Sequence, residues 1–434
     1  MSSNSVKSPS HIRRVLTRAR AAFDGNPKLM DCISEHLPGP PPSMLNHTVS
    51  SSTRGLTDTE KSFSQAQELK WVASFPNLVP LLREKLKRNS SFHEVSNRVL
   101  DLSNPEHATL FLSLHPDCTG IGLPPEIRSE ADTTSHINAK LVWPAILIIQ
   151  LMCELDTERC HLIPYVSSSE GKKGAGIPDG ATFEHLGGKG VITLEWKTEN
   201  AMPAKALSEL VSALEELKKR GYSIPIRFWW PREGHSRPFA KCLSQVWGQM
   251  RNKQYNVIVA TLSSLTETFF FYRHPTEHKN VLFMSSAVAY KDIEVLDFVA
   301  IFAFALGLTS LSDDELPVFD TERWGYLDLY YDAHPQKQPI PTVNEVTAIL
   351  QQQSTVPPAN AVSKSKSQSK PQPGSSNPKT VYSTFTDDES DVDATPKAKK
   401  KRASTPIDSD VNATPVAPTR LLRRGRSARY GRTD

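Results

Sequence analysis

Residues 177–180 read Ile-Pro-Asp-Gly, and residues 191–197 read Val-Ile-Thr-Leu-Glu-Trp-Lys. In the second stretch apolar and polar residues alternate, which is the side-chain period of a β-strand. Its apolar side chains are expected on one face, and Thr193, Glu195 and Lys197 on the other. The pattern therefore predicts a strand that carries an acid and an amine together on one face.

The residues between these two stretches predict a β-hairpin. Residues 187–190 form a glycine-rich turn, and residues 181–186 can supply the partner strand. With the turn placed this way, Asp179 falls one residue out of phase with the face that carries Glu195. We therefore expect a bulge or kink near Pro178 to turn Asp179 inward.

The polar residues of this hairpin suit metal-assisted chemistry. Asp179, Glu195 and the backbone carbonyl of Trp196 would offer oxygen ligands to Mg²⁺ or Mn²⁺. The ion would polarise a phosphodiester and lower the pKa of a coordinated water. Lys197, beside that water, would orient it and stabilise developing negative charge. The residues thus predict a metal-dependent phosphodiesterase site.

The same residues resemble the motif of the PD-(D/E)XK phosphodiesterase superfamily, the restriction-endonuclease-like nucleases, and the chain as a whole is similar to fungal proteins that carry such a domain. The resemblance covers about residues 136–275. It implies an α/β fold with an αβββαβ core and a mixed central sheet. It also implies that Asp179 is the metal-binding aspartate, Glu195 the second acidic ligand and Lys197 the catalytic lysine, with Mg²⁺ (or Mn²⁺) as cofactor.

Further residues acquire roles only through this resemblance. The first helix of the core would be Asn138–Asp156, on which Glu154 is the candidate for a supporting acid, followed by a first strand at 161–167. A later helix, 239–252, carries Gln245 and Gln249 one turn apart on one face. We expect Glu154, Gln245 and Gln249 to support the metal ligands from behind.

Each half of the motif also occurs elsewhere in the chain. Glu-x-Lys recurs at 68–70, 216–218 and 277–279, and Pro-Asp recurs at 116–117. Both halves stand at hairpin spacing in one place, which favours the functional interpretation. The alternative is a surface hairpin whose Glu195 and Lys197 form an exposed ion pair contributing about 0–1 kcal/mol.

Composition indicates one principal core with unpacked ends. The chain has 434 residues, 33 of them proline, and 38% are hydrophobic. We predict a mostly flexible basic N-terminal region at 1–60, a helical lead-in at 61–135, the nuclease-like core at 136–310, an extension of the core at 311–353 and a disordered basic tail at 354–434.

Charge is distributed unevenly along the chain. The net charge is +4, but from Thr355 onward there are 15 Lys and Arg against 8 Asp and Glu, leaving 36 against 39 before it. The part expected to fold is thus weakly acidic, which argues against a general-purpose nucleic-acid binder. Contact with phosphates must come from a local groove, the metal or the tail.

The tail contains a candidate nuclear import signal. Its basic residues are Lys397, Lys399, Lys400, Lys401 and Arg402. We expect a nuclear protein that can bind an import receptor. The alternative location is mitochondrial, because residues 1–23 lack a secretory apolar core, contain four arginines and are free of acids.

Membrane and zinc functions are not expected. The apolar runs at 141–153 and 298–308 fall short of the roughly 20 residues that cross a bilayer, so they predict buried helices. The five cysteines lack C-x-x-C spacing, which fits structural thiols in a reducing compartment.

The predicted function is metal-dependent hydrolysis of phosphodiester bonds in nucleic acid, with DNA expected ahead of RNA. One alternative is a catalytically silent nuclease-fold protein that acts as a binding or scaffold module in the nucleus. Another is a nuclear interaction protein that depends on its tail.

Overall fold

A computed structural model describes residues 9–22, 26–37, 39–43, 61, 63–116, 118–119, 123–167, 179–186, 188–199, 201–202, 207–231, 238–251, 256–335 and 339–355. All of them fall within the first of the two units into which the chain divides, residues 1–362. The predicted tail, except for residues 354–355, lies outside the described residues. The import candidates Lys397, Lys399, Lys400, Lys401 and Arg402 lie outside them as well.

The protein is a mixed α/β structure. Its described residues form one nine-stranded sheet of mixed strand orientation, in the order β2-β3-β4-β6-β7-β8-β1-β5, with β9 paired to β7. The strands are β1 (Trp71–Ser74), β2 (Tyr165–Ser167), β3 (Gly180–Phe183), β4 (Gly190–Trp196), β5 (Ile226–Arg227), β6 (Val259–Ser263), β7 (Glu267–Tyr272), β8 (Val281–Met284) and β9 (Val288–Ala289).

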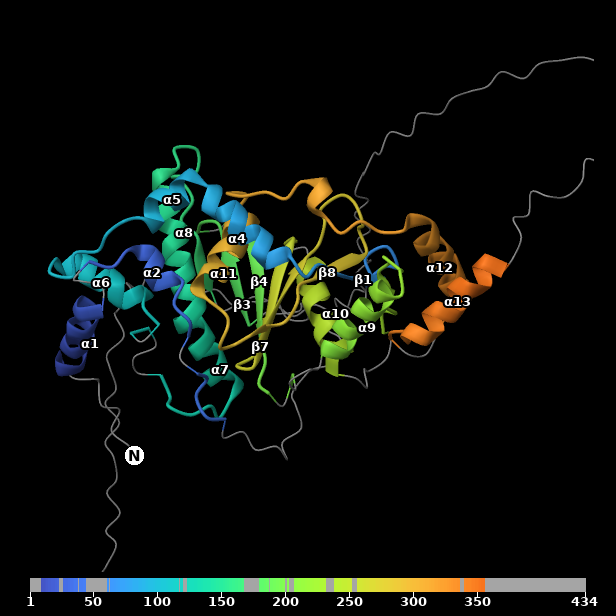
Figure 1. The fold of residues 1–434 in the computed structure, drawn as a ribbon, viewed down its shortest axis with the longest axis horizontal. Coiled ribbons are helices and arrows are strands. Elements are labelled where there is room, and N and C mark those ends of the chain that lie inside the picture. The colour runs from blue at the N-terminus through green and yellow to red at the C-terminus, as the bar shows by residue number, and fades with distance from the viewer. Residues whose placement is uncertain are drawn as a thin grey trace, which may run out of the picture. The chain divides into compact units, whose positions relative to one another are not determined.

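Helices cover both faces of this sheet (Figure 1). Helices α4, α8 and α11 pack together on one side, while α9 and α10 lie on the other. The helices are α1 (Pro9–Ala22), α2 (Leu29–Ile33), α4 (Leu78–Arg88), α5 (Ser90–Ser96), α6 (Pro105–Leu114), α7 (Glu130–Ile137), α8 (Trp143–Leu155), α9 (Ser208–Lys219), α10 (Pro238–Arg251), α11 (Val295–Ala305), α12 (Thr321–Ala333) and α13 (Val343–Thr355), with a π-helical turn η1 (Asn138–Val142) and a 3-10 turn η2 (Asp313–Glu315).

Strand β4 lies inside the sheet, and all seven of its residues are buried. It pairs antiparallel with β3 and parallel with β6. Because β4 and β6 are parallel, their carboxyl ends meet at the same edge of the sheet, the place where open α/β sheets bind ligands. Residues that follow Trp196 and Ser263 are therefore neighbours.

The predicted hairpin is present, but its register differs from the expected one. Gly180 lies opposite Leu194, and the pairing shifts at a bulge between Thr182 and Phe183. The extra residue lies inside the hairpin, whereas Pro178, near which we expected a bulge or kink, lies outside the described residues. Extending the observed register by one residue puts Asp179 opposite Glu195, so the two acids share a face.

The first core helix begins earlier than predicted. Helix α7, the π turn and α8 form one continuous helix from Glu130 to Leu155, whereas the sequence predicted a start at Asn138. Ser129 caps it by accepting a hydrogen bond from the N–H of Asp132. Length and composition would allow this helix to cross a membrane, but 67% of its most apolar window is buried inside the protein. It packs on α11 as a core helix.

The regions before the core take more part in the fold than expected. The predicted helical lead-in contains β1, which pairs with β8 and β5 and so belongs to the central sheet. The predicted flexible N-terminal region contains α1, α2 and a proline-rich segment, residues 39–43. That segment is held by a hydrogen bond from the N–H of Ile127 to the carbonyl of Pro42, 3.0 Å.

Candidate functional site

The structure brings the three predicted catalytic residues together at the carboxyl end of β4. The Nζ atom of Lys197 lies 2.5 Å from Oε1 of Glu195 and 3.7 Å from Oδ2 of Asp179. Glu195 and Lys197 are only 3% and 5% exposed. The pair is therefore buried, which argues against the alternative of an exposed surface hairpin.

A third carboxylate completes the cluster. Oε1 of Glu130 accepts a hydrogen bond from Nζ of Lys197 at 3.2 Å. Glu130 is the first residue of α7, where the helix dipole favours a negative charge. One ammonium thus lies among three carboxylates, and the cluster carries an excess of negative charge.

Sequence reasoning missed Glu130 and proposed Glu154 in its place. Glu154 is exposed near the other end of the same long helix, about 36 Å away along the axis at 1.5 Å per residue, so it does not support the site. The error follows from placing the helix start at Asn138. The signal that would have found Glu130 is the Ser129-x-x-Asp132 capping pattern.

The backbone of Trp196 positions Asp179. The N–H of Trp196 donates to Oδ2 of Asp179 at 2.7 Å, whereas the next N–H, that of Lys197, donates to Ser263 on β6. Within a strand the N–H and C=O of one residue point the same way, so the carbonyl of Trp196 also faces the Asp179 side. The predicted ligand set of two carboxylates and one carbonyl therefore lies in one corner of the site.

Helix α10 supports Glu195 from behind. Nε2 of Gln249 donates to Oε2 of Glu195 at 2.5 Å, and both side chains are buried. Gln245 is also buried one turn earlier, but its Oε1 has no hydrogen-bond partner among the described residues. Of the two predicted supporting glutamines, Gln249 contacts an acidic residue of the motif.

Burial and crowding alter the ionisation of the cluster. Desolvation, reinforced by the charge of Glu195, raises the pKa of Asp179 to about 7. Desolvation alone would lower the pKa of Lys197, but Glu195, Asp179 and Glu130 together raise it above its usual value. Lys197 is therefore an ammonium at neutral pH, and Asp179 is poised to ionise when positive charge arrives.

A divalent cation fits this corner by charge and donor type. Mg²⁺ binds through one or two carboxylates, keeps several waters and needs oxygen donors, which Asp179, Glu195 and the Trp196 carbonyl supply. Its charge would favour the ionised form of Asp179, whose pKa is raised by burial and then by the charge of Glu195. Within the described part of the chain, no group of three or more His, Cys, Asp or Glu side chains is arranged to hold a metal.

Cys242, on the same helix as Gln249, is a buried thiol near the cluster. Burial raises its pKa to about 12, with Lys197 acting against the shift and Glu195 adding to it. Its thiol is therefore protonated at neutral pH. This agrees with its predicted role as a structural thiol.

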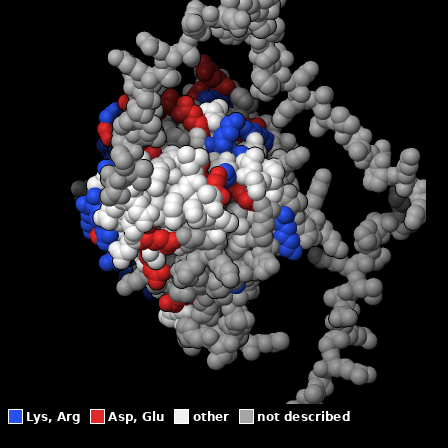
Figure 2. Space-filling model, turned by 90° about the vertical axis from the view of Figure 1, so that its right-hand side faces the viewer, with Lys and Arg blue, Asp and Glu red and all other residues white. Residues whose placement is uncertain are grey.

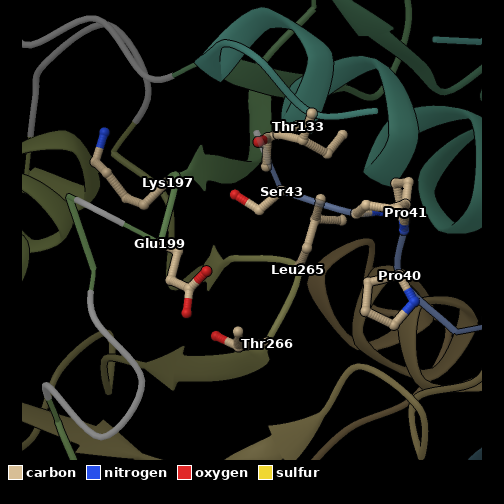
Figure 3. A pocket seen from close by; sticks show the side chains of 10 residues that line it. Pro40, Pro41, Ser43, Thr133, Lys197, Glu199, Leu265 and Thr266 are labelled. Atoms are coloured by element: carbon tan, nitrogen blue, oxygen red, sulfur yellow. The ribbon is translucent and has the colours of Figure 1, made fainter. Parts of the chain in front are cut away.

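A cavity of about 290 Å³ borders the cluster on the other side of the Lys197 stem. Its lining consists of Pro40, Pro41, Pro42, Ser43, Ile127, Thr133, Lys197, Glu199, Leu265 and Thr266. Figure 3 shows Glu199 directed into this space and the amine of Lys197 directed away from Ser43 and Thr266. The site thus has a charged side, with the carboxylates, and an open side, with the cavity.

Comparison with known proteins adds no relative: no protein-family model, curated protein or solved structure matches this chain.

Proposed function

We propose that this protein is a divalent-metal-dependent nuclease that hydrolyses phosphodiester bonds in nucleic acid. The observation that carries the proposal is the placement of the Lys197 ammonium among Asp179, Glu195 and Glu130 at the carboxyl end of β4. Burying charged groups with such an excess of acid is costly to the fold, and clusters of this kind concentrate at functional sites.

The order of elements supports a restriction-endonuclease-like core. Helix α8 is followed by β2, β3 and β4, then by α10 and β6, which repeats the αβββαβ order. The segment between β4 and α10, with α9 and β5, is an addition to that order. Asp179 immediately precedes the second of these three strands, and Glu195 lies on the third.

Each residue has a role that its surroundings suit. Asp179, Glu195 and the Trp196 carbonyl would hold Mg²⁺ or Mn²⁺, which when bound supplies a Lewis acid and a water of lowered pKa. Lys197 is fully charged, so it would act as a cation that holds the attacking water or a phosphate oxygen and not as a base. Gln249 fixes Glu195, and Glu130 fixes Lys197.

The charge of the surface is compatible with local contact to a substrate. Figure 2 shows small acidic and basic groups around a broad uncharged area on the described part of the face toward the viewer. A nucleic acid would therefore be held mainly at the site and by the basic tail. We expect DNA ahead of RNA as the substrate and a nuclear location.

The test is cleavage by the full-length protein. Purified protein is incubated with plasmid and with single-stranded DNA in Mg²⁺, Mn²⁺ or EDTA. The wild type is compared with Lys197→Met and with a matched control, Lys219→Met, which changes an exposed lysine of α9. We expect metal-dependent cleavage by the wild type and by Lys219→Met, and a loss of at least about a hundredfold for Lys197→Met. Equal activity of wild type and Lys197→Met would refute the assignment.

The tight contact between Lys197 and Glu195 favours one alternative, a nuclease-fold module that binds nucleic acid without cleaving it. In that case the wild type is inactive in every metal, yet it retards nucleic acid in a gel.

A further inference from the structure

The cavity beside Lys197 is built from segments far apart in the chain. Lys197 and Glu199 follow β4, Leu265 and Thr266 lie between β6 and β7, and Thr133 lies on α7, one turn after Glu130. The same helix face therefore serves both the carboxylate cluster and the cavity. Anything bound in the cavity lies next to the proposed catalytic residues.

The N-terminal segment forms another wall of the cavity. Pro40, Pro41, Pro42 and Ser43 line the cavity, and Ser43 forms a β-bridge with Ile127. Proline rings present flat apolar faces and lose little entropy when they are covered, so they are suited to packing against a planar ligand. The cavity thus has an apolar wall.

Polar side chains from several segments also reach the cavity. Figure 3 shows the side-chain oxygens of Glu199, Ser43, Thr133 and Thr266 around a common space. Glu199 is exposed, and no described residue bonds to its carboxylate. Its free carboxylate can accept hydrogen bonds from N–H or O–H groups of a ligand.

The charge of the described cavity lining disfavours phosphate. Glu199 places a carboxylate at the cavity, whereas the ammonium of Lys197 points toward Asp179, Glu195 and Glu130. Among the described lining residues, a phosphate would therefore meet a carboxylate before it met a cation. The favoured ligand is a neutral, partly planar group that carries hydrogen-bond donors and lies next to a phosphate held at the metal side.

We propose that this cavity binds one unpaired nucleoside of the substrate, with its base against the prolines and its donors on Glu199, so that the protein acts on single-stranded nucleic acid or on unpaired ends. The inference rests on the proposed nuclease function. A volume of about 290 Å³ suits a single small group and cannot admit a base-paired duplex. A paired base would first have to leave its stack, at a cost of a few kcal/mol.

The first experiment measures binding without cleavage. Adenosine and cytidine are titrated into the full-length protein in EDTA, and binding is followed by ligand-observed NMR. The same titrations are made with two variants: Leu265→Trp, which fills the cavity, and Glu199→Gln, which removes the charge of the cavity. Thr109→Trp, an exposed position on α6, is the matched control. We expect binding by wild type and Thr109→Trp, and an affinity about tenfold lower for Glu199→Gln, the loss expected for a hydrogen bond to a charged group.

Two results would overturn the inference. One is absence of nucleoside binding by the wild type. The other is inorganic phosphate binding that strengthens in Glu199→Gln, which would make the cavity a phosphate site. If Leu265→Trp loses its cooperative thermal transition, Glu199→Gln alone decides, because an exposed Glu-to-Gln change preserves the fold.

The second experiment separates this inference from the nuclease proposal. Cleavage of a single-stranded oligonucleotide is compared with that of its blunt duplex. We expect the single strand to be cut at least about tenfold faster, and Leu265→Trp to reduce that preference. Equal cleavage of both substrates refutes the cavity assignment while leaving the nuclease proposal intact. Nucleoside binding without any cleavage refutes the nuclease proposal and identifies the cavity as a binding site only.

Discussion

Replacing Asp179 by Asn should stabilise the fold above neutral pH. Burial and Glu195 raise the pKa of Asp179 from 3.8 to about 7, so at higher pH the folded protein carries a carboxylate where it favours a neutral group. Asparagine has the same shape and can still accept the N–H of Trp196, but it has no charge.

The size of the gain follows from the pKa. One pKa unit corresponds to about 1.4 kcal/mol, so the displacement from 3.8 to about 7 sets an upper limit of about 4 kcal/mol. The side chain of Asp179 is 28% exposed, and solvent screening reduces this limit, so we expect about 1–3 kcal/mol.

The pH dependence has a definite sign. The folded pKa of Asp179 lies above the unfolded one, so wild-type stability falls as the pH rises from 3.8 to about 7. The variant lacks this loss. Its advantage should therefore be absent near pH 4, grow across that window and level off above pH 7.

Urea denaturation in EDTA at about pH 4, 6 and 8 measures these differences. Asp292→Asn, an exposed position, is the control and should show no such trend. Mg²⁺ should then stabilise the wild type and leave Asp179→Asn unchanged, because a ligand stabilises only the state that binds it. A variant that is no more stable than wild type at pH 8, or that gains equally at all three pH values, would refute the reasoning.

Three further perturbations test the surroundings of the site and of the core. Gln249→Leu removes the hydrogen-bond donor to buried Glu195 and should lower the free energy of unfolding by about 1–3 kcal/mol in denaturant titration. Gln245→Leu should lower it less, because the Oε1 atom of Gln245 has no hydrogen-bond partner among the described residues. Equal losses would contradict the role of Gln249. Glu130→Gln keeps the shape of the side chain but removes the negative charge beside Lys197. It should reduce metal-dependent cleavage about tenfold with little change in thermal midpoint, and an unaltered kcat would exclude a role for Glu130 in the reaction. Arg83→Met removes the cation beside Asp297, which is buried at the start of α11 and whose pKa burial has already raised to about 6. The substitution raises the pKa of Asp297 further, so the loss of unfolding free energy, about 3 kcal/mol at pH 8, should be smaller at pH 5. A loss that does not depend on pH would contradict this reasoning.

The sequence was sufficient for the central hairpin because both of its signals are local. Alternation over residues 191–197 and the glycine-rich turn predicted β3 and β4, and both are present. The register was wrong by several residues, because the strands pair only from Phe183 and Gly190 and leave a longer loop than the predicted turn, and because a bulge adds a further residue of shift. Neither loop length nor bulge is visible in the alternation of residues. The face shared by Asp179 and Glu195 therefore required coordinates.

Sequence patterns could not predict the long-range contacts of the fold. Strand β1 is only four residues long, and it joins the sheet through β8 and β5, which are distant in the chain. The proline-rich residues 40–43 read as unstructured by composition, yet they line the cavity beside Lys197. Neither assignment follows from local propensity, because each depends on a partner surface that forms only in the fold.

The π-helical turn at Asn138–Val142 lies between Glu130 and the core helix α8. In a regular α-helix, each inserted or deleted residue rotates everything beyond it by about 100° around the axis. A π turn holds one residue more than an α turn, so deleting one residue from it would restore regular α-helix and leave both Glu130 and α8 in their orientations. The turn is therefore a place where the chain can lose a residue without separating Glu130 from the amine of Lys197.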